Sequence, residues 1–151
     1  MPNIVQTNQL TKIIDGKELV KNVNIHVKKG EVYGFLGPNG AGKTTVMKML
    51  TNLWKPTSGE VWLFGEKLTP ASYEVLKRMG SIIEFPCFYD HMSGKDNLQL
   101  HSEYMGYHTP GCVEDALEML GLADASEKQV KSYSLGMKQR LGIARAILCK
   151  P

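Results

Sequence analysis

The chain has 151 residues, of which 42% are hydrophobic and 22% are charged, and its net charge is +3. This composition is typical of a globular domain with a sizeable core and excludes a disordered or fibrous chain. The small positive charge suits an anionic ligand or a membrane-facing site, but it is too weak to predict nucleic-acid binding, and we expect none. The three cysteines lie far apart without metal-ligand spacing, which indicates a reducing, cytoplasmic setting.

The first half of the sequence predicts a hairpin, a buried strand and a helix. Residues 3–14 and 19–30 alternate apolar and polar side chains around the turn signal Asp15-Gly16, which is typical of an antiparallel hairpin. Residues 31–37 are nearly all apolar and bounded by glycine, which predicts a strand buried on both faces. Residues 43–53 carry apolar side chains at helical spacing.

The second half becomes mainly helical. The pattern predicts strands over 61–65 and 81–85, and helices over 70–80 and 135–148. Between residues 85 and 133 the periodicity is helical and no clear strand is visible. No apolar run approaches the roughly 20 residues that span a bilayer, so we expect any membrane connection to pass through a partner.

A glycine-rich segment between the predicted buried strand and the helix fits the phosphate-binding pattern G-x-x-x-x-G-K-[ST]. It consists of Gly37, Pro38, Asn39, Gly40, Ala41, Gly42, Lys43 and Thr44, with Thr45 following. Glycines let main-chain N–H groups approach a polyphosphate closely, and a helix N-terminus favours anions. Lys43 brings a positive charge to the β- and γ-phosphates, and Thr44 offers a hydroxyl to Mg²⁺. We therefore predict a nucleoside triphosphate with magnesium, held by amides from Asn39 to Thr45.

A second informative stretch is SYSLGMKQRLGIARAIL, residues 132–148. Ser134 stands near the start of a basic helix, where free N–H groups and a hydroxyl suit an anion. Taken alone, an ordinary capped helix also explains this stretch.

Together the two stretches resemble the nucleotide-binding domain of ABC transporters, in which a hairpin, the phosphate loop, a helical segment and a signature turn follow in this order. The family signature is L-S-G-G-Q. The five aligned residues are Tyr133, Ser134, Leu135, Gly136 and Met137. Ser134 and Gly136 keep the serine and the second glycine, whereas Leu135 and Met137 depart from the pattern.

The resemblance implies an α/β P-loop NTPase fold with an N-terminal antiparallel β subdomain and an α-helical subdomain. Residues 1–84 correspond to the ATP-binding core, 85–133 to the helical subdomain, and 134–151 to the signature and the helix after it. The family usually stacks adenine on an aromatic residue near the hairpin turn. Ile14 stands there instead, so we expect the phosphates to supply most of the affinity.

Glu84 indicates which group of ABC transporter ATPases the chain resembles. Most ABC domains have a glutamine there, which contacts the metal or the attacking water. Glu84, followed by FPCFYDHMSGKDNL, is similar to the ATPases of lantibiotic-immunity and bacitracin-resistance exporters. A carboxylate near a triphosphate requires Mg²⁺ or a proton to offset the repulsion. The resemblance implies catalytic roles for Lys43 and Glu84 and metal contacts for Thr44 and Glu84; the alternative is a surface glutamate at a strand end.

The resemblance implies a subunit that couples ATP binding and hydrolysis to export of a peptide antibiotic. Such subunits work as homo- or heterodimers, with ATP between the phosphate loop of one and the signature of the other. They sit on transmembrane permease subunits at the cytoplasmic face of the cell membrane. The aromatic residues Phe85, Phe88 and Tyr89 are candidate permease contacts.

The later family elements are a strand of four apolar residues ending in aspartate, a catalytic glutamate and a histidine. The strand and the glutamate after it do not occur in the 151 residues, and every histidine of the chain precedes the signature. We therefore expect the C-terminal part of the core to be missing, strand edges and apolar surface to be exposed, self-association, and poor hydrolysis of ATP.

Several other functions remain open. One is nucleotide binding without hydrolysis, and others are an ABC ATPase of another export class and an ABC protein that acts on ribosomes. A GTPase is disfavoured because no N-K-x-D-like guanine motif occurs. A small-molecule kinase is disfavoured because kinases lack the pattern of residues 132–148.

Overall fold

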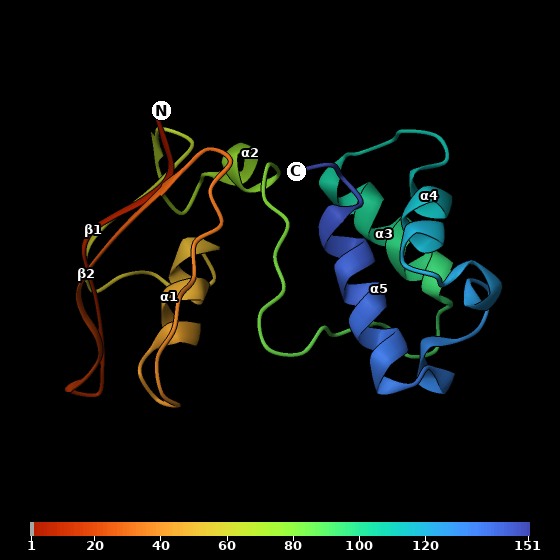
Figure 1. Ribbon diagram of the computed structural model, residues 1–151, viewed down its shortest axis with the longest axis horizontal. Coiled ribbons are helices and arrows are strands. Elements are labelled where there is room, and N and C mark those ends of the chain that lie inside the picture. The colour runs from red at the N-terminus through yellow and green to blue at the C-terminus, as the bar shows by residue number, and fades with distance from the viewer. Residues whose placement is uncertain (1) are drawn as a thin grey trace. The chain divides into compact units, whose positions relative to one another are not determined.

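The computed structural model describes residues 2–151, which divide into two compact units after Leu76 (Figure 1). The N-terminal unit, up to Leu76, contains all the strands and two of the helices. The C-terminal unit, Lys77–Pro151, contains three α-helices. Each unit has buried apolar residues of its own.

A four-stranded antiparallel sheet in the order β2-β1-β3-β4 forms the N-terminal unit. Its strands are β1 (Asn3–Ile14), β2 (Lys17–Lys28), β3 (Ser58–Leu63) and β4 (Glu66–Lys67). The predicted hairpin is confirmed, because β1 pairs with β2 from Asn3 opposite Lys28 to Ile14 opposite Lys17. The turn residues between them, Asp15 and Gly16, both have positive φ, as the tight two-residue turns of hairpins require.

Helix α1 (Lys43–Leu50) follows the glycine loop and contacts β2. Val46 and Met49, three residues apart on one helical face, are buried, and so are Leu10 and Leu63 of the sheet. The spacing of apolar residues in the sequence thus produces an amphipathic helix beside an amphipathic sheet. That contact holds the start of α1 close to β2.

Residues 31–37 form no strand in the structure, and the prediction of a strand buried on both faces is wrong. Val32 is 99% exposed and Leu36 is 93% exposed. A strand is maintained by backbone hydrogen bonds to a neighbour, and no strand formed by residues 2–151 pairs with this segment. The apolar residues of segment 31–37 favour burial, but the described residues do not cover them.

Two further predicted elements also differ. Residues 81–85 form no strand, for the same reason: they have no backbone partner in the sheet. The helix predicted over 70–80 is reduced to the single turn α2 (Tyr73–Leu76). Short isolated helical turns are marginal because each must nucleate before it gains hydrogen bonds.

The C-terminal unit packs three helices around one apolar core: α3 (Gly94–Met105), α4 (Cys112–Met119) and α5 (Leu135–Ile147). Short 3-10 turns, η1 (Ala123–Ala125) and η2 (Val130–Ser132), join α4 to α5. Buried residues of this core include Leu98, Val113, Leu117, Leu141 and Ala144. The helical character predicted between residues 85 and 133 is confirmed. No helix among residues 2–151 combines the length and apolar character needed to cross a bilayer.

Candidate functional site

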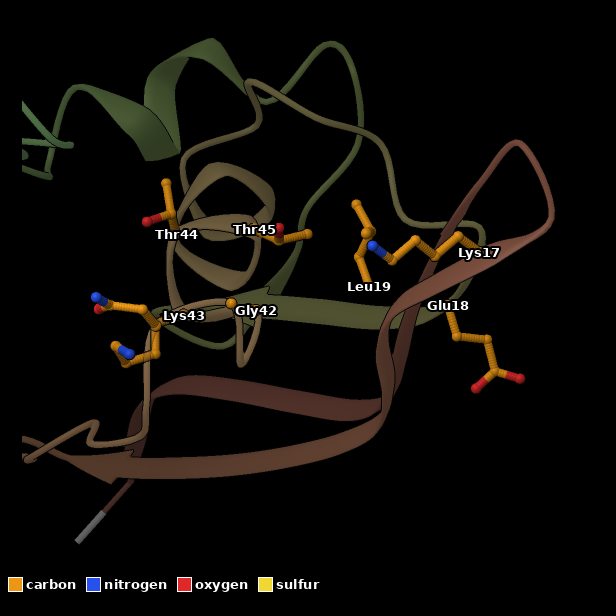
Figure 2. Close-up of a pocket in the computed structure, with 9 residues that line it drawn as sticks. Lys17, Glu18, Leu19, Gly42, Lys43, Thr44 and Thr45 are labelled. Atoms are coloured by element: carbon orange, nitrogen blue, oxygen red, sulfur yellow. The ribbon is translucent and has the colours of Figure 1, made fainter.

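A pocket of about 380 Å³ lies between the glycine loop and the first residues of β2 (Figure 2). Its lining consists of Lys17, Glu18, Leu19, Asn39, Gly40, Gly42, Lys43, Thr44 and Thr45. Ligand sites commonly measure roughly 300–1,000 Å³, so the volume suits a small molecule. Of the loop residues predicted to hold a triphosphate, all but Ala41 line the pocket.

Gly42 brings the loop into direct contact with β2. It precedes α1 with φ of 89°, in the left-handed region that favours glycine. A Cβ atom here would lie 2.5 Å from the carbonyl oxygen of Leu19 and 2.9 Å from Cγ2 of Val20. Any side chain at this position would therefore push the loop off the strand.

The first turn of α1 presents main-chain donors to the pocket. The first N–H groups of an α-helix have no partner inside the helix, and they carry the positive end of its dipole. The first turn of α1 contains no acidic residue that would compete with an anion, and Gly42 makes no side-chain cap. Lys43, Thr44 and Thr45, half-buried at this end, line the pocket. The arrangement suits a polyanion.

Lys43 folds its side chain back across the loop. Its Nζ donates hydrogen bonds to the carbonyl oxygens of Gly37 and Pro38, the latter at 2.8 Å. An ammonium group has three donors, so one remains for a phosphate oxygen. The loop is therefore closed by the same side chain that supplies its charge.

Magnesium fits this donor set only together with a phosphate ligand. Among residues 2–151, no group of three or more histidine, cysteine, aspartate or glutamate side chains is positioned to hold a metal ion. The hydroxyl of Thr44 is a hard oxygen donor, and Mg²⁺ is commonly bound by few protein ligands plus substrate phosphates. Glu84, the other predicted metal contact, lies in the C-terminal unit, where it is exposed and has φ of 58°.

The predicted signature residues lie at the N-terminus of α5. Ser134 is the N-cap, and its Oγ accepts a hydrogen bond from the N–H of Met137 at 3.2 Å. Ser134, Leu135 and Gly136 are all exposed. This geometry is that of an ordinary capped helix, and it also leaves first-turn N–H groups accessible to an anion.

The C-terminal unit contains a second pocket, of about 370 Å³. Its lining consists of Cys87, Phe88, Tyr89, Asn97, Leu100, His101, Tyr104 and Arg145. The Arg145 guanidinium lies 4.7 Å from the ring centroid of Phe88 and donates to the carbonyl oxygen of Cys87 at 2.7 Å. Burial lowers the pKa of His101, and the charge of Arg145 lowers it further, which favours the neutral imidazole.

Sequence reasoning singled out only Phe88 and Tyr89 of this second pocket. Arg145 was missed because it lies on α5, far from these residues in the sequence, and no local pattern connects them. The only sequence feature that pointed to Arg145 was its positive charge on the helix predicted to follow the signature.

The chain belongs to the ABC transporter family, whose profile matches residues 20–151. A Bacillus subtilis protein named "Uncharacterized ABC transporter ATP-binding protein YcbN" is 62% identical over the whole chain, which covers 49% of that protein. The bacitracin transport ATP-binding protein BcrA of Bacillus licheniformis is 46% identical, with the same coverage. The lantibiotic transport ATP-binding protein SrtF of Streptococcus pyogenes is 38% identical over 98% of this chain and 63% of its own length.

The predicted relationship to bacitracin and lantibiotic transport ATPases is thus confirmed. The chain spans about half the length of several of the curated relatives it matches.

Solved structures confirm the fold class. A structure described as the ATP binding subunit of an ABC transporter superposes with a TM-score of 0.88, over 98% of this chain and 63% of that one, at 24% identity. The cbiO1 subunit from Clostridium perfringens superposes with a TM-score of 0.81, over the whole of this chain and 63% of that one, at 23% identity. The α/β P-loop NTPase fold predicted from the sequence is therefore the observed one.

Proposed function

We propose that this chain is the ATP-binding part of a transporter subunit that couples ATP binding and hydrolysis to export of a peptide antibiotic. The observation that carries the proposal is the pocket between β2 and the glycine loop, which presents Lys43 and the first turn of α1 to one ligand. The names of the relatives BcrA and SrtF support the export of bacitracin-like or lantibiotic peptides.

In this proposal each loop residue contributes to the binding of the phosphates. Main-chain amides from Asn39 to Thr45 donate to the phosphate oxygens, and Lys43 neutralises part of their charge. The hydroxyl of Thr44 would be a ligand of Mg²⁺, which would offset further negative charge of the phosphates. The side chains lining the pocket include no aromatic residue, so charge rather than stacking dominates the affinity.

A second nucleotide-binding subunit completes the site. Ser134 and the N–H groups near Gly136 contact the γ-phosphate of a nucleotide held in the loop of that second subunit, since they form an exposed helix N-terminus. Closure of the pair around ATP and its reopening after hydrolysis then drive the transport step.

The membrane partners are transmembrane permease subunits, which this chain contacts at the cytoplasmic face of the membrane. The C-terminal unit supplies the contact through the exposed Phe85 and Tyr89 and through the pocket that Phe88 and Arg145 line. An aromatic and cationic pocket suits a helix end with free carbonyl groups or a carboxylate.

The domain division and the role of Glu84 belong to the same proposal. Residues 1–84 act as the ATP-binding core, 85–133 as the helical subdomain, and 134–151 as the signature with its helix. Glu84, the last residue of the first part, is the second proposed metal contact beside Thr44.

The role of Glu84 is tested by Glu84→Gln, which removes the charge and keeps the shape. We expect the factor by which Mg²⁺ strengthens ATP binding to fall by about threefold, since exposed charge interactions contribute roughly 0.2–1 kcal/mol. The measurement is ATP titration with and without Mg²⁺. The control is Glu118→Gln on α4, an exposed glutamate outside the proposed site. An unchanged Mg²⁺ factor would establish Glu84 as a surface residue only.

The proposed function itself is tested by Lys43→Ala. We expect ATP affinity to fall by about 10- to 100-fold, because hydrogen bonds to charged groups contribute roughly 1.5–3 kcal/mol. Displacement of a fluorescent ATP analogue measures the affinity, and phosphate release in the same samples separates binding from hydrolysis. The control Lys29→Ala removes an exposed lysine outside the pocket and should bind ATP normally. Equal affinity in the Lys43 variant and the native chain would refute the proposal.

A further inference from the structure

Lys17 is a second positive charge in the nucleotide pocket. It is the first residue of β2 and lines the wall that faces the glycine loop. Side chains alternate along a strand, so Lys17 and Leu19 project to one side and Glu18 to the other. Figure 2 shows this alternation: the Lys17 side chain extends toward Leu19 and α1, and the Glu18 carboxylate points away.

The ammonium of Lys17 has no hydrogen-bond or ion-pair partner among residues 2–151. The adjacent carboxylate is already engaged, because Glu18 accepts from Nζ of Lys21 at 3.3 Å. The other cation of the pocket, Lys43, is held at the start of the loop by the carbonyl oxygens of Gly37 and Pro38. Lys17 is therefore an uncommitted charge on the opposite wall.

The position of this wall is set by packing. Gly42 lies against the Leu19 carbonyl so closely that a Cβ atom would be 2.5 Å from that oxygen. Lys17 is two residues before Leu19 in the same strand. The distance between its backbone and the first turn of α1 is therefore set by backbone contact rather than by a flexible loop.

We propose that Lys17 binds the α-phosphate of the nucleotide and so acts as a second phosphate-binding cation in this site. The proposal rests on the proposed function. A phosphate chain with its γ end at Lys43 presents its α end to β2. An ammonium is a compact, strongly hydrated charge that gains most from an anionic oxygen, and the pocket offers the base no aromatic partner.

Lys17→Met tests the contact, because methionine keeps an apolar stem and removes the charge. We expect affinity for ATP and for ADP to fall by the same factor, about three- to tenfold, since both nucleotides carry an α-phosphate. Lys17→Arg keeps the charge and should bind both nucleotides nearly as well as the native chain. The measurement is displacement of a fluorescent ATP analogue by ATP or ADP at constant salt.

Lys28→Met is the matched control, since it removes a charge from the same strand outside the pocket and leaves the Glu18–Lys21 ion pair intact. We expect it to change affinity by less than twofold. An equal loss in this variant would mean that Lys17 acts only through the general charge of the hairpin, and would overturn the proposal. Native affinity of Lys17→Met, or a loss confined to ATP, would overturn it as well.

The outcomes separate this inference from the proposed function. If Lys43→Ala abolishes ATP binding and Lys17→Met has no effect, the transporter function stands and the Lys17 contact is refuted. If the native chain binds neither ATP nor ADP, both are refuted.

Discussion

Replacement of Gly42 by alanine is expected to abolish detectable ATP binding and to destabilise the N-terminal unit by about 2–4 kcal/mol. The left-handed backbone, with φ of 89°, costs about 1–2 kcal/mol for a residue with a side chain. The remainder comes from the clash with Leu19 and Val20, which forces the loop away from β2. Chemical denaturation followed by circular dichroism measures the stability, and ATP titration measures the binding.

The control for this experiment is Gly65→Ala, in the turn between β3 and β4. Gly65 also has positive φ, of 83°, but a Cβ atom there would meet no atom within 4 Å. We expect this variant to show only the conformational cost, about 1–2 kcal/mol, and to bind ATP. If Gly42→Ala and Gly65→Ala have the same stability and the same ATP affinity, the contact between the glycine loop and β2 is not needed to form the site.

The second large effect concerns the exposed apolar segment 31–37. Val32 and Leu36 are almost fully exposed and Tyr33 is 45% exposed, although this stretch has the sequence of a buried strand. Exposed apolar residues with unpaired backbone groups favour association between copies of a chain. We expect the 151-residue chain to form species at least twice its mass of 16.8 kDa at micromolar concentration. Light scattering coupled to size exclusion measures this mass.

The double variant Val32→Lys, Leu36→Lys tests whether this segment causes the association. We expect the monomer fraction to rise several-fold, because two charges oppose burial of the segment. Leu53→Lys provides the control: this leucine is 65% exposed elsewhere in the same unit, and its substitution should leave the mass distribution unchanged. A monodisperse native chain would contradict the prediction.

The elements that were predictable from sequence depend on neighbours along the chain. The hairpin of β1 and β2 follows from alternation around Asp15 and Gly16, and both residues adopt the positive φ that such a turn requires. Ser134, predicted to stand near the start of a basic helix, caps α5 with its hydroxyl. Local propensity and local hydrogen bonds are sufficient for these features.

The strand predicted over 31–37 was wrong for the opposite reason. Its apolar sequence favours burial, but a strand forms only where another strand supplies hydrogen bonds. The sheet that residues 2–151 form has the order β2-β1-β3-β4 and contains no partner for this segment. Residues 81–85 differ from prediction in the same way.

By itself, the sequence determined the chemistry of the loop: glycines that admit a polyanion, one lysine at its end, and a threonine hydroxyl at the start of a helix. Only the tertiary structure decided what faces that loop. The Leu19 carbonyl lies against Gly42, and this contact places Lys17 on the far wall of the pocket. Such a contact joins residues distant in the chain through packing of α1 on the sheet, and periodicity along the sequence carries no information about it.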